Sequence, residues 1–159
     1  MKSKRDLKKE SLEILKELEA RSIATIATAR ENRPYSAAIH YTVAGSFVYF
    51  ITGEGTQKSK NLSGNPYVSL AVIEKSELPI GIQAEGKASI VTDKDEANRV
   101  LANFTKVWYA IDYTPPVMNI PKGKALLIRI DIKNIQWFQT AEKPENIKMK
   151  KIEFNYTKN

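Results

Sequence analysis

The chain has 159 residues, of which 42% are hydrophobic and 27% are charged. This length suits one domain with a sizeable core, and the composition is typical of a folded globular protein. Cysteine is absent and His40 is the only histidine. This excludes disulfides, thiolate nucleophiles and metal sites built from cysteines or several histidines.

The formal net charge is +7, and the basic residues are spread along the chain rather than gathered into one segment. Nucleic-acid-binding proteins usually concentrate their positive charge, so this pattern indicates at most an anionic small ligand. No stretch of about 18 apolar residues is present. The first 20 residues mix charges with spaced leucines, unlike a signal peptide. We therefore expect a cytoplasmic protein that contacts neither membrane nor nucleic acid.

In the first half of the chain, the periodicity predicts an amphipathic helix followed by an antiparallel meander. Leucine and isoleucine recur at helical spacing over Asp6 to Glu19. Three strands are then expected. Ser22–Thr28 is rich in isoleucine, threonine and alanine, Tyr35–Val43 alternates apolar and polar residues, and Phe47–Thr52 is apolar on both faces.

The second half continues with helices and strands joined by short connections. Thr56 is a suitable N-cap and Gly64 a suitable C′ residue for a two-turn helix. A longer helix is expected from Asp93 to Trp108, and strands over Tyr67–Ile73, Ile80–Ile90 and Ala125–Phe138. The alternation in the last strand changes phase, which predicts a β-bulge near Lys133 and Asn134. The segment Ile147–Tyr156 either adds an edge strand or wraps a partner.

These elements amount to six strands and about three helices, with few helical crossovers. We therefore expect a mainly β protein, a six-stranded antiparallel barrel with peripheral helices. It forms a single domain over residues 1–159, with a core at about 18–138 and a polar tail at 141–159.

The most informative segment for function is the start of the two-turn helix. Exposed N–H groups at a helix N-terminus favour anions, and Thr56, Gln57 and Lys58 add a hydroxyl, an amide and a positive charge. This combination suits a phosphate group. The alternative is an ordinary capped helix with a solvated lysine. The segment is not a P-loop, because two residues separate Gly55 from Lys58.

Other candidate residues admit a structural interpretation as well as a functional one. His40 lies within a strand and is either structural or catalytic. Trp108, Tyr109, Trp137 and Phe138 either stack on a planar ligand or fill the core or a dimer interface. Glu85 is expected on the solvent face of its strand. No residue pattern indicates a metal site.

From about Leu18 to Phe138, the chain resembles the pyridoxamine 5'-phosphate oxidase-like family of FMN-binding split β-barrels, most recognisably from Ser46 to Val72. A strand ending in Phe50-Ile51-Thr52 is followed by Thr56-Gln57-Lys58 and then by Asn65-Pro66-Tyr67-Val68-Ser69-Leu70. In the family, a Ser-Arg-Lys-like phosphate clamp and an Asn-Pro-x-Val-Ser-Leu strand occupy these places. Gln57 therefore stands where many members carry arginine.

The resemblance implies an FMN site at the interface of a homodimer. Lys58 would pair with the FMN phosphate, assisted by Thr56 and Gln57, and Ile51 and Thr52 would touch the ribityl and flavin region. Gln83 would approach the ring system. The residues that would lie along the isoalloxazine ring, partly through their backbone groups, are Ser36, Ala37, Ala38 and Ile39.

The C-terminal arginine and histidine of the true oxidase are missing here, since the last arginine is Arg129. The resemblance is therefore to uncharacterised members, and implies an FMN-dependent oxidoreductase acting on an undetermined small-molecule substrate or electron acceptor. One alternative is a non-enzymatic module that holds flavin, deazaflavin or haem. Another is a small barrel that binds single-stranded nucleic acid.

Overall fold

The computed structural model describes residues 4–74, 77–108, 120–121 and 123–154, with side chains over these ranges except 4–9, 105–108 and 144. The helices are α1 (Lys4–Glu19), α2 (Gln57–Gly64), α3 (Lys94–Trp108) and the 3₁₀ helix η2 (Pro144–Asn146). The strands are β1 (Ile23–Arg30), β2 (Arg33–Ala44), β3 (Phe47–Gly53), β4 (Tyr67–Glu74), β5 (Ile80–Ile90), β6 (Ala125–Gln139) and β7 (Lys148–Glu153).

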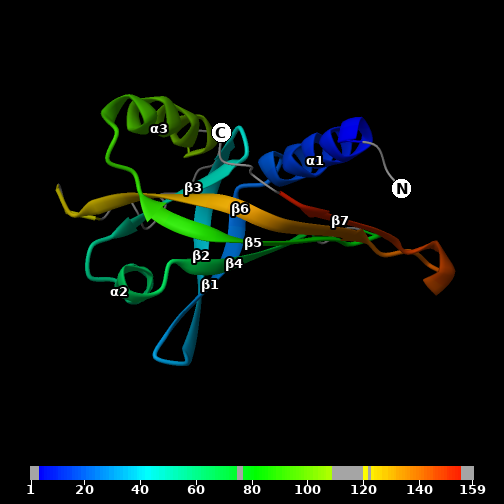
Figure 1. Cartoon of the computed structure of the whole chain (residues 1–159), viewed down its shortest axis with the longest axis horizontal. Helices are drawn as coiled ribbons and strands as arrows, with labels where there is room; N and C mark the ends of the chain where they lie inside the picture. Colours follow the sequence, from blue (N-terminus) through cyan, green and yellow to red (C-terminus); the bar gives the residue numbers. More distant parts are fainter. Residues whose placement is uncertain (1–3, 75–76, 109–119, 122, 155–159) are drawn as a thin grey trace.

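Six of these strands form a closed antiparallel barrel (Figure 1). They follow the order β3-β2-β1-β4-β5-β6, and β3 closes the ring by pairing with β6 from Phe47–Asp131 to Gly53–Ala125. This confirms the predicted mainly β barrel. For the segment Ile147–Tyr156, the structure supports the first of the two alternatives, because β7 pairs with the second half of β6 as an edge strand.

The hairpin between β1 and β2 is longer than the sequence pattern predicted and projects from the barrel (Figure 1). Pairing continues to Arg30 and Arg33, so only Glu31 and Asn32 form the turn. Their φ angles are +53° and +59°. Two successive residues with positive φ are the signature of a type I′ turn, whose twist matches that of the flanking strands.

The predicted β-bulge is confirmed. Glu85 pairs with Asn134, whereas the next residue of β5, Gly86, pairs with Ile132, so Lys133 is the extra residue of β6. The carbonyl of Lys133 accepts a hydrogen bond from the N–H of Phe154, at 2.7 Å. The chain after β7 is therefore fastened to the bulge.

Apolar side chains that alternate along the strands fill the barrel, and helices cover its openings. Ile14 and Leu18 of α1 and Leu62 of α2 pack against this interior cluster. The Tyr41 hydroxyl donates a buried hydrogen bond to the carbonyl of Leu18, at 2.7 Å. Each helix therefore stabilises the barrel by removing apolar area from water.

Helix α3 lies outside the barrel, against β3 (Figure 1). Its Val100 and Phe104 are buried with Tyr49 in a second, smaller cluster. The Tyr49 hydroxyl donates to Glu96 of α3 at 2.8 Å, and Arg129 of β6 pairs with the same carboxylate at 3.1 Å. A polar contact thus joins α3 to two barrel strands.

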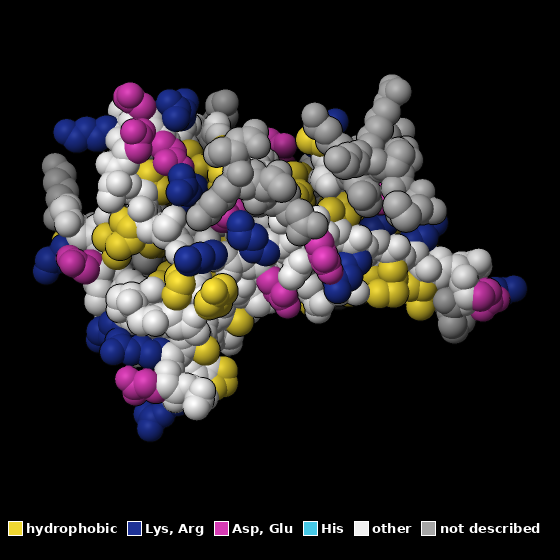
Figure 2. All heavy atoms as spheres, in the orientation of Figure 1, with side chains coloured by type: hydrophobic (Ala, Val, Ile, Leu, Met, Phe, Trp, Pro, Cys, Tyr) yellow, Lys and Arg dark blue, Asp and Glu magenta, His cyan; other side chains and the backbone are white. Residues whose placement is uncertain are grey.

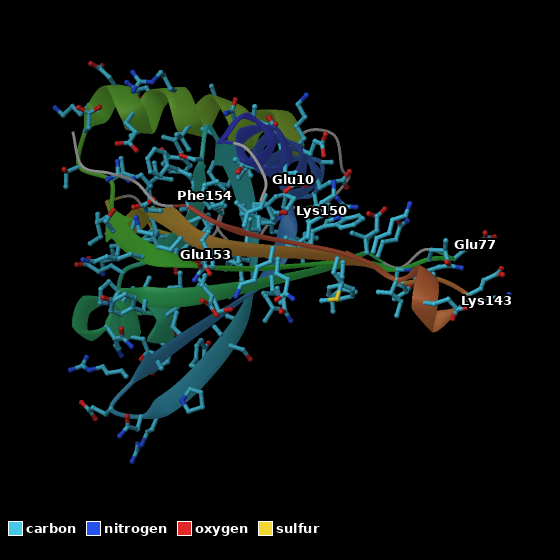
Figure 3. All side chains as sticks on the ribbon, turned by 45° about the vertical axis from the view of Figure 1, so that its right-hand side comes forward. Glu10, Glu77, Lys143, Lys150, Glu153 and Phe154 are labelled. Carbon is cyan, nitrogen blue, oxygen red and sulfur yellow. The ribbon has the colours of Figure 1, made fainter. Side chains whose placement is uncertain are left out.

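Beyond the barrel, β5, β6 and β7 continue as an arm. Pro79 and Thr140 continue the pairing at its outer end, since the N–H of Thr140 donates to the carbonyl of Pro79 at 3.0 Å. Figure 3 shows Glu77 and Lys143 near the far end of this arm. Lys150 of β7 forms an ion pair with Glu13 at 3.0 Å, so α1 packs against the arm.

Two details differ from the sequence-based expectation. Gly64 was expected at C′ with a left-handed backbone, but it is the last residue of α2 and has no positive φ. The cap is Asn65, in an extended conformation, whose N–H bonds to the carbonyl of Asn61. The helical spacing of Ala97, Val100, Leu101 and Phe104 predicts one apolar face on α3, but Leu101 is 40% exposed. Tyr109 and the side chain of Trp108 lie outside the described residues.

Candidate functional site

Helix α2 begins directly after β3, and hydroxyl groups organise this junction. Thr56 caps the helix, because its hydroxyl oxygen accepts a hydrogen bond from the N–H of Ser59 at 3.3 Å. The same oxygen lies 3.0 Å from the hydroxyl of Thr52, which is buried at the end of β3. The turn between β3 and α2 is therefore held by contacts on both sides.

A second set of contacts fixes α2 on the barrel. The Gln57 amide donates to Asn61 Oδ1 at 2.8 Å, and Asn61 Nδ2 donates to the hydroxyl of Thr28 in β1 at 3.0 Å. Asn61 and Thr28 are both buried. The side chains of Thr56 and Gln57, both expected to assist a phosphate, thus also stabilise the helix itself.

Lys58 remains as the charged group of the first helical turn. Its side chain is half-buried, and burial lowers the pKa of its ammonium group. A partly desolvated cation is stabilised by an opposite charge. The N–H groups of Gln57 and Lys58 lie in the first turn, where helical geometry supplies no carbonyl partner. This turn can therefore hold an anion through one ammonium group and the backbone.

The four residues expected beside the flavin ring face two sides of β2. Ser36 and Ala38 are exposed on the outside of the barrel, whereas Ile39 is buried inside it and Ala37 packs against the same interior. Only Ser36 and Ala38, which we call the β2 shelf, present side chains to a ligand outside the barrel. Ala37 and Ile39 reach such a ligand through their backbone only.

Ile51 and Thr52, the two residues expected near the ribityl chain, face opposite sides of β3. Thr52 faces the barrel interior and is 2% exposed. Ile51 faces outward and is half-buried, packed against the cluster under α3. Of the pair, Ile51 is the one with side-chain surface outside the barrel.

Gln83 lies on the outside of the barrel but away from the β2 shelf. Ala38 pairs with Thr25, Thr25 with Ala71, and Ala71 with Gln83, so two strands separate the ends of this row. At about 4.8 Å per strand, the distance is about 14 Å. The structure therefore does not bring Gln83 together with Ser36 and Ala38 within one chain.

The outer surface of β2, β1, β4 and β5 carries small side chains on its first three strands, a feature that was not predicted from the sequence. Its exposed or half-buried central positions are Thr25, Ala27, Ser36, Ala38, Ser69 and Ala71. The sequence could have indicated these small residues, because Thr25 and Ala27 alternate with the core residues of Ser22–Thr28. We call this surface the outer face.

A groove of about 560 Å³ crosses the outer face beside the bulge. It is lined by Ala27 and Ala29 of β1, Tyr67 and Ser69 of β4, Glu85 of β5, and Lys133 and Asn134 of β6, among others. Its size lies in the range of small-molecule sites. The groove reaches β2 itself next to the β2 shelf, because Pro34 lines it and Ala27 pairs with Ser36.

Charged side chains of both signs are interspersed on the face of the molecule shown in Figure 2. Within the described part of the chain, no group of three or more histidine or acidic residues is placed to hold a metal ion. Among the same residues, no helix has the length and apolar character needed to span a membrane.

The closed antiparallel barrel, its capping helices and the turn between β3 and α2 define the split β-barrel class. The family model described as pyridoxamine 5'-phosphate oxidase matches residues 10–137. The chain belongs to this family. A search of curated proteins finds no match to it.

Solved structures share the fold at low sequence identity. A FAD-binding protein from Mesorhizobium loti aligns with a TM-score of 0.66 and 19% identity, over 82% of this chain and 94% of that one. A putative pyridoxamine 5'-phosphate oxidase from Listeria innocua gives 0.63 and 20%, over 79% and 95%. A heme binding protein from Mycobacterium smegmatis gives 0.65 and 15%, over 88% and 57%.

Proposed function

We propose that the protein binds FMN and acts as an oxidoreductase, with each flavin held at the interface of a homodimer. The observation that carries this proposal is the half-buried Lys58 in the first turn of α2, on a barrel of the pyridoxamine 5'-phosphate oxidase family. Solved relatives of the same fold are described as FAD-binding, which supports a flavin. FMN is proposed rather than FAD because FMN carries one phosphate group, and the first turn of α2 offers one positively charged side chain, Lys58.

In this proposal, Lys58 and the N–H groups of Gln57 and Lys58 bind the phosphate. Thr52 and Thr56 act indirectly, by holding the turn through the contact between their hydroxyls. The β2 shelf and Ile51 lie along the flavin. A bound flavin supplies the electron chemistry, so the chain needs no cysteine or second histidine of its own.

The homodimer is proposed because the site is incomplete in one chain. Gln83 lies about 14 Å from the β2 shelf of its own barrel, at about 4.8 Å per strand. A second copy that packs against the row formed by Ala38, Thr25, Ala71 and Gln83 would bring its Gln83 to this shelf, and the groove beside the bulge would stay open at the edge of this contact. The small side chains there, such as Thr25 and Ala71, allow close approach of another sheet.

The direct test is the absorbance spectrum of the purified protein in the flavin region, followed by titration with FMN. Lys58→Ala is expected to weaken FMN binding by about 1.5–3 kcal/mol, the contribution of a hydrogen bond to a charged group. Lys60→Ala is the matched control, because Lys60 is exposed on the same helix. Riboflavin, which lacks the phosphate, should bind equally to the wild type and Lys58→Ala.

The results of these experiments test flavin binding, the role of Lys58 and oxidoreductase activity separately. A wild-type protein that binds no FMN contradicts the proposed function. Equal FMN affinity in Lys58→Ala and Lys60→Ala leaves flavin binding intact but removes Lys58 from the site. If the loaded protein is not reduced by NADH, NADPH or other small donors, the non-enzymatic flavin module is the correct alternative.

A further inference from the structure

The groove on the outer face has a polar wall that the proposed flavin site does not use. The bulge in β6 creates it, because the extra residue Lys133 and its neighbour Asn134 both line the groove. In a regular strand, consecutive side chains point to opposite faces. Bulges are common next to functional sites, where they redirect a side chain.

The polar groups of this wall are held in place by one another. Asn134 Nδ2 donates to Glu85 Oε2 at 3.2 Å, and Lys133 is paired with Asp131. Since each carboxylate oxygen can accept more than one hydrogen bond, Glu85 still offers acceptor sites to a ligand. The side-chain carbonyl of Asn134 is a further acceptor. The wall therefore suits a ligand that donates hydrogen bonds.

The rest of the groove is apolar and flat. Its floor contains Ala27, Ala29 and Gly86. Gly86 lines the floor through its backbone only, because its side-chain position faces the barrel interior, where an added Cβ would lie 2.5 Å from the carbonyl oxygen of Asp131. At the rim, the ring of Tyr67 is 68% exposed. An exposed aromatic ring beside an apolar floor favours a planar ligand.

We propose that the groove bounded by Tyr67, Glu85 and Asn134 is a binding site for a small planar heterocycle that carries an uncharged amide edge. The ring would lie on the alanine floor against Tyr67, and its N–H group would face Glu85. The site is separate from the phosphate-binding turn of α2 and does not require a bound flavin. Since Pro34 of β2 also lines the groove, a second ligand bound there would lie beside the β2 shelf.

The test uses nicotinamide as the probe and nicotinic acid as its matched analogue, in which a carboxylate replaces the amide. Binding to the ¹⁵N-labelled full chain is followed by amide chemical shifts. Nicotinamide is expected to shift the amides of Ala27, Glu85 and Asn134 in a saturable manner. Nicotinic acid is expected to bind at least about fivefold more weakly, because its carboxylate meets that of Glu85.

Three variants make the test specific. Tyr67→Ala should weaken nicotinamide binding about fivefold through the loss of ring contact. Glu85→Gln should abolish the preference for nicotinamide over nicotinic acid, because it removes the repelling charge. Lys87→Gln is the control, since Lys87 is exposed on the same face of β5 but does not line the groove.

Several results would overturn this proposal. One is the absence of saturable shifts at the groove, and another is equal binding of the two probes by the wild type. A third is that saturating FMN removes the nicotinamide shifts and Tyr67→Ala weakens FMN binding, because the groove would then hold the flavin itself. Loss of FMN binding in Lys58→Ala does not bear on the groove, so failure of the proposed function remains distinguishable.

Discussion

Asn61 of α2 donates a hydrogen bond to the hydroxyl of Thr28 in β1, 3.0 Å away, and both residues are buried. This contact joins the helix that carries Lys58 to the barrel wall. Because Asn61 also accepts from Gln57, one side chain connects the first turn of α2 to β1. The position of the candidate phosphate turn therefore depends on a buried amide.

Asn61→Ala should lower the free energy of unfolding by about 1–3 kcal/mol, since it leaves the Thr28 hydroxyl buried without this donor. Urea denaturation measures the change. Ser63→Ala, at an exposed position of the same helix, should change stability by less than about 0.5 kcal/mol. Equal effects of the two substitutions would show that the buried amide does not anchor α2.

Two glycines of β5 should differ in their response to alanine. At Gly86, an added Cβ would meet the backbone carbonyl of Asp131 at 2.5 Å, whereas at Gly81 it would meet the ring of Phe138. A half-buried side chain can rotate away, but the backbone of a paired strand cannot. Gly86→Ala should therefore destabilise the protein more than Gly81→Ala in denaturation experiments. The reverse order would contradict this account of the bulge.

FMN affinity should fall at alkaline pH. Burial lowers the pKa of Lys58, so in the free protein its ammonium group loses its proton below the ordinary lysine range. Since only the charged form pairs with the phosphate, affinity should decrease by up to about tenfold per pH unit above this pKa. FMN titrations between pH 7 and 10 measure this pH dependence of the affinity, and Lys58→Ala should show no such decrease. Riboflavin provides the second control.

Tyr49 couples α3 to the barrel in a manner that also depends on pH. Burial, together with the neighbouring Glu96 carboxylate, raises the pKa of Tyr49 to about 12. The folded state therefore favours the neutral phenol, and this contribution to stability is complete below pH 10 and lost as the pH rises towards 12. Tyr49→Phe should cost about 1 kcal/mol at pH 7. Its stability should then fall less steeply above pH 10, as measured by thermal unfolding.

A mixed dimer tests whether Gln83 completes the partner's site. When Lys58→Ala and Gln83→Ala subunits combine, a composite site predicts one intact and one doubly altered FMN site in each mixed dimer. If each site lay within a single chain, both sites would carry one substitution and neither would be intact. FMN titration of dimers purified with two different tags distinguishes these cases.

Much of the barrel follows from local pattern. Strand-forming composition, period-two alternation and turn residues located the six barrel strands, and the phase change after Ile132 located the bulge at Lys133. Gly64 was interpreted wrongly, because glycine after a helical segment usually adopts a left-handed backbone, whereas here Asn65 ends the helix in an extended conformation. The strand β7 could not be assigned, because its polar sequence acquires a partner only through distant pairing with β6.

The candidate site was less accessible to sequence reasoning. The residue types around Thr56, Gln57 and Lys58 indicated an anion site, but not that the first two would be used in contacts with Thr52 and Asn61. Strand alternation did imply that Ala37 and Ala38 face opposite sides. Which side faces the interior depends on the closed barrel. The groove required both strand pairing and the bulge, so no local pattern predicted it.

The pairing of β3 with β6 brings Gly53 against Ala125, residues far apart in the chain. A ring closed by so distant a contact cannot be completed until β6 has left the ribosome, and loop closure on this scale slows folding. Until β6 has been synthesised, the edge of β3 that will pair with it therefore has no partner strand. Aggregation during expression is therefore the hazard that this topology creates.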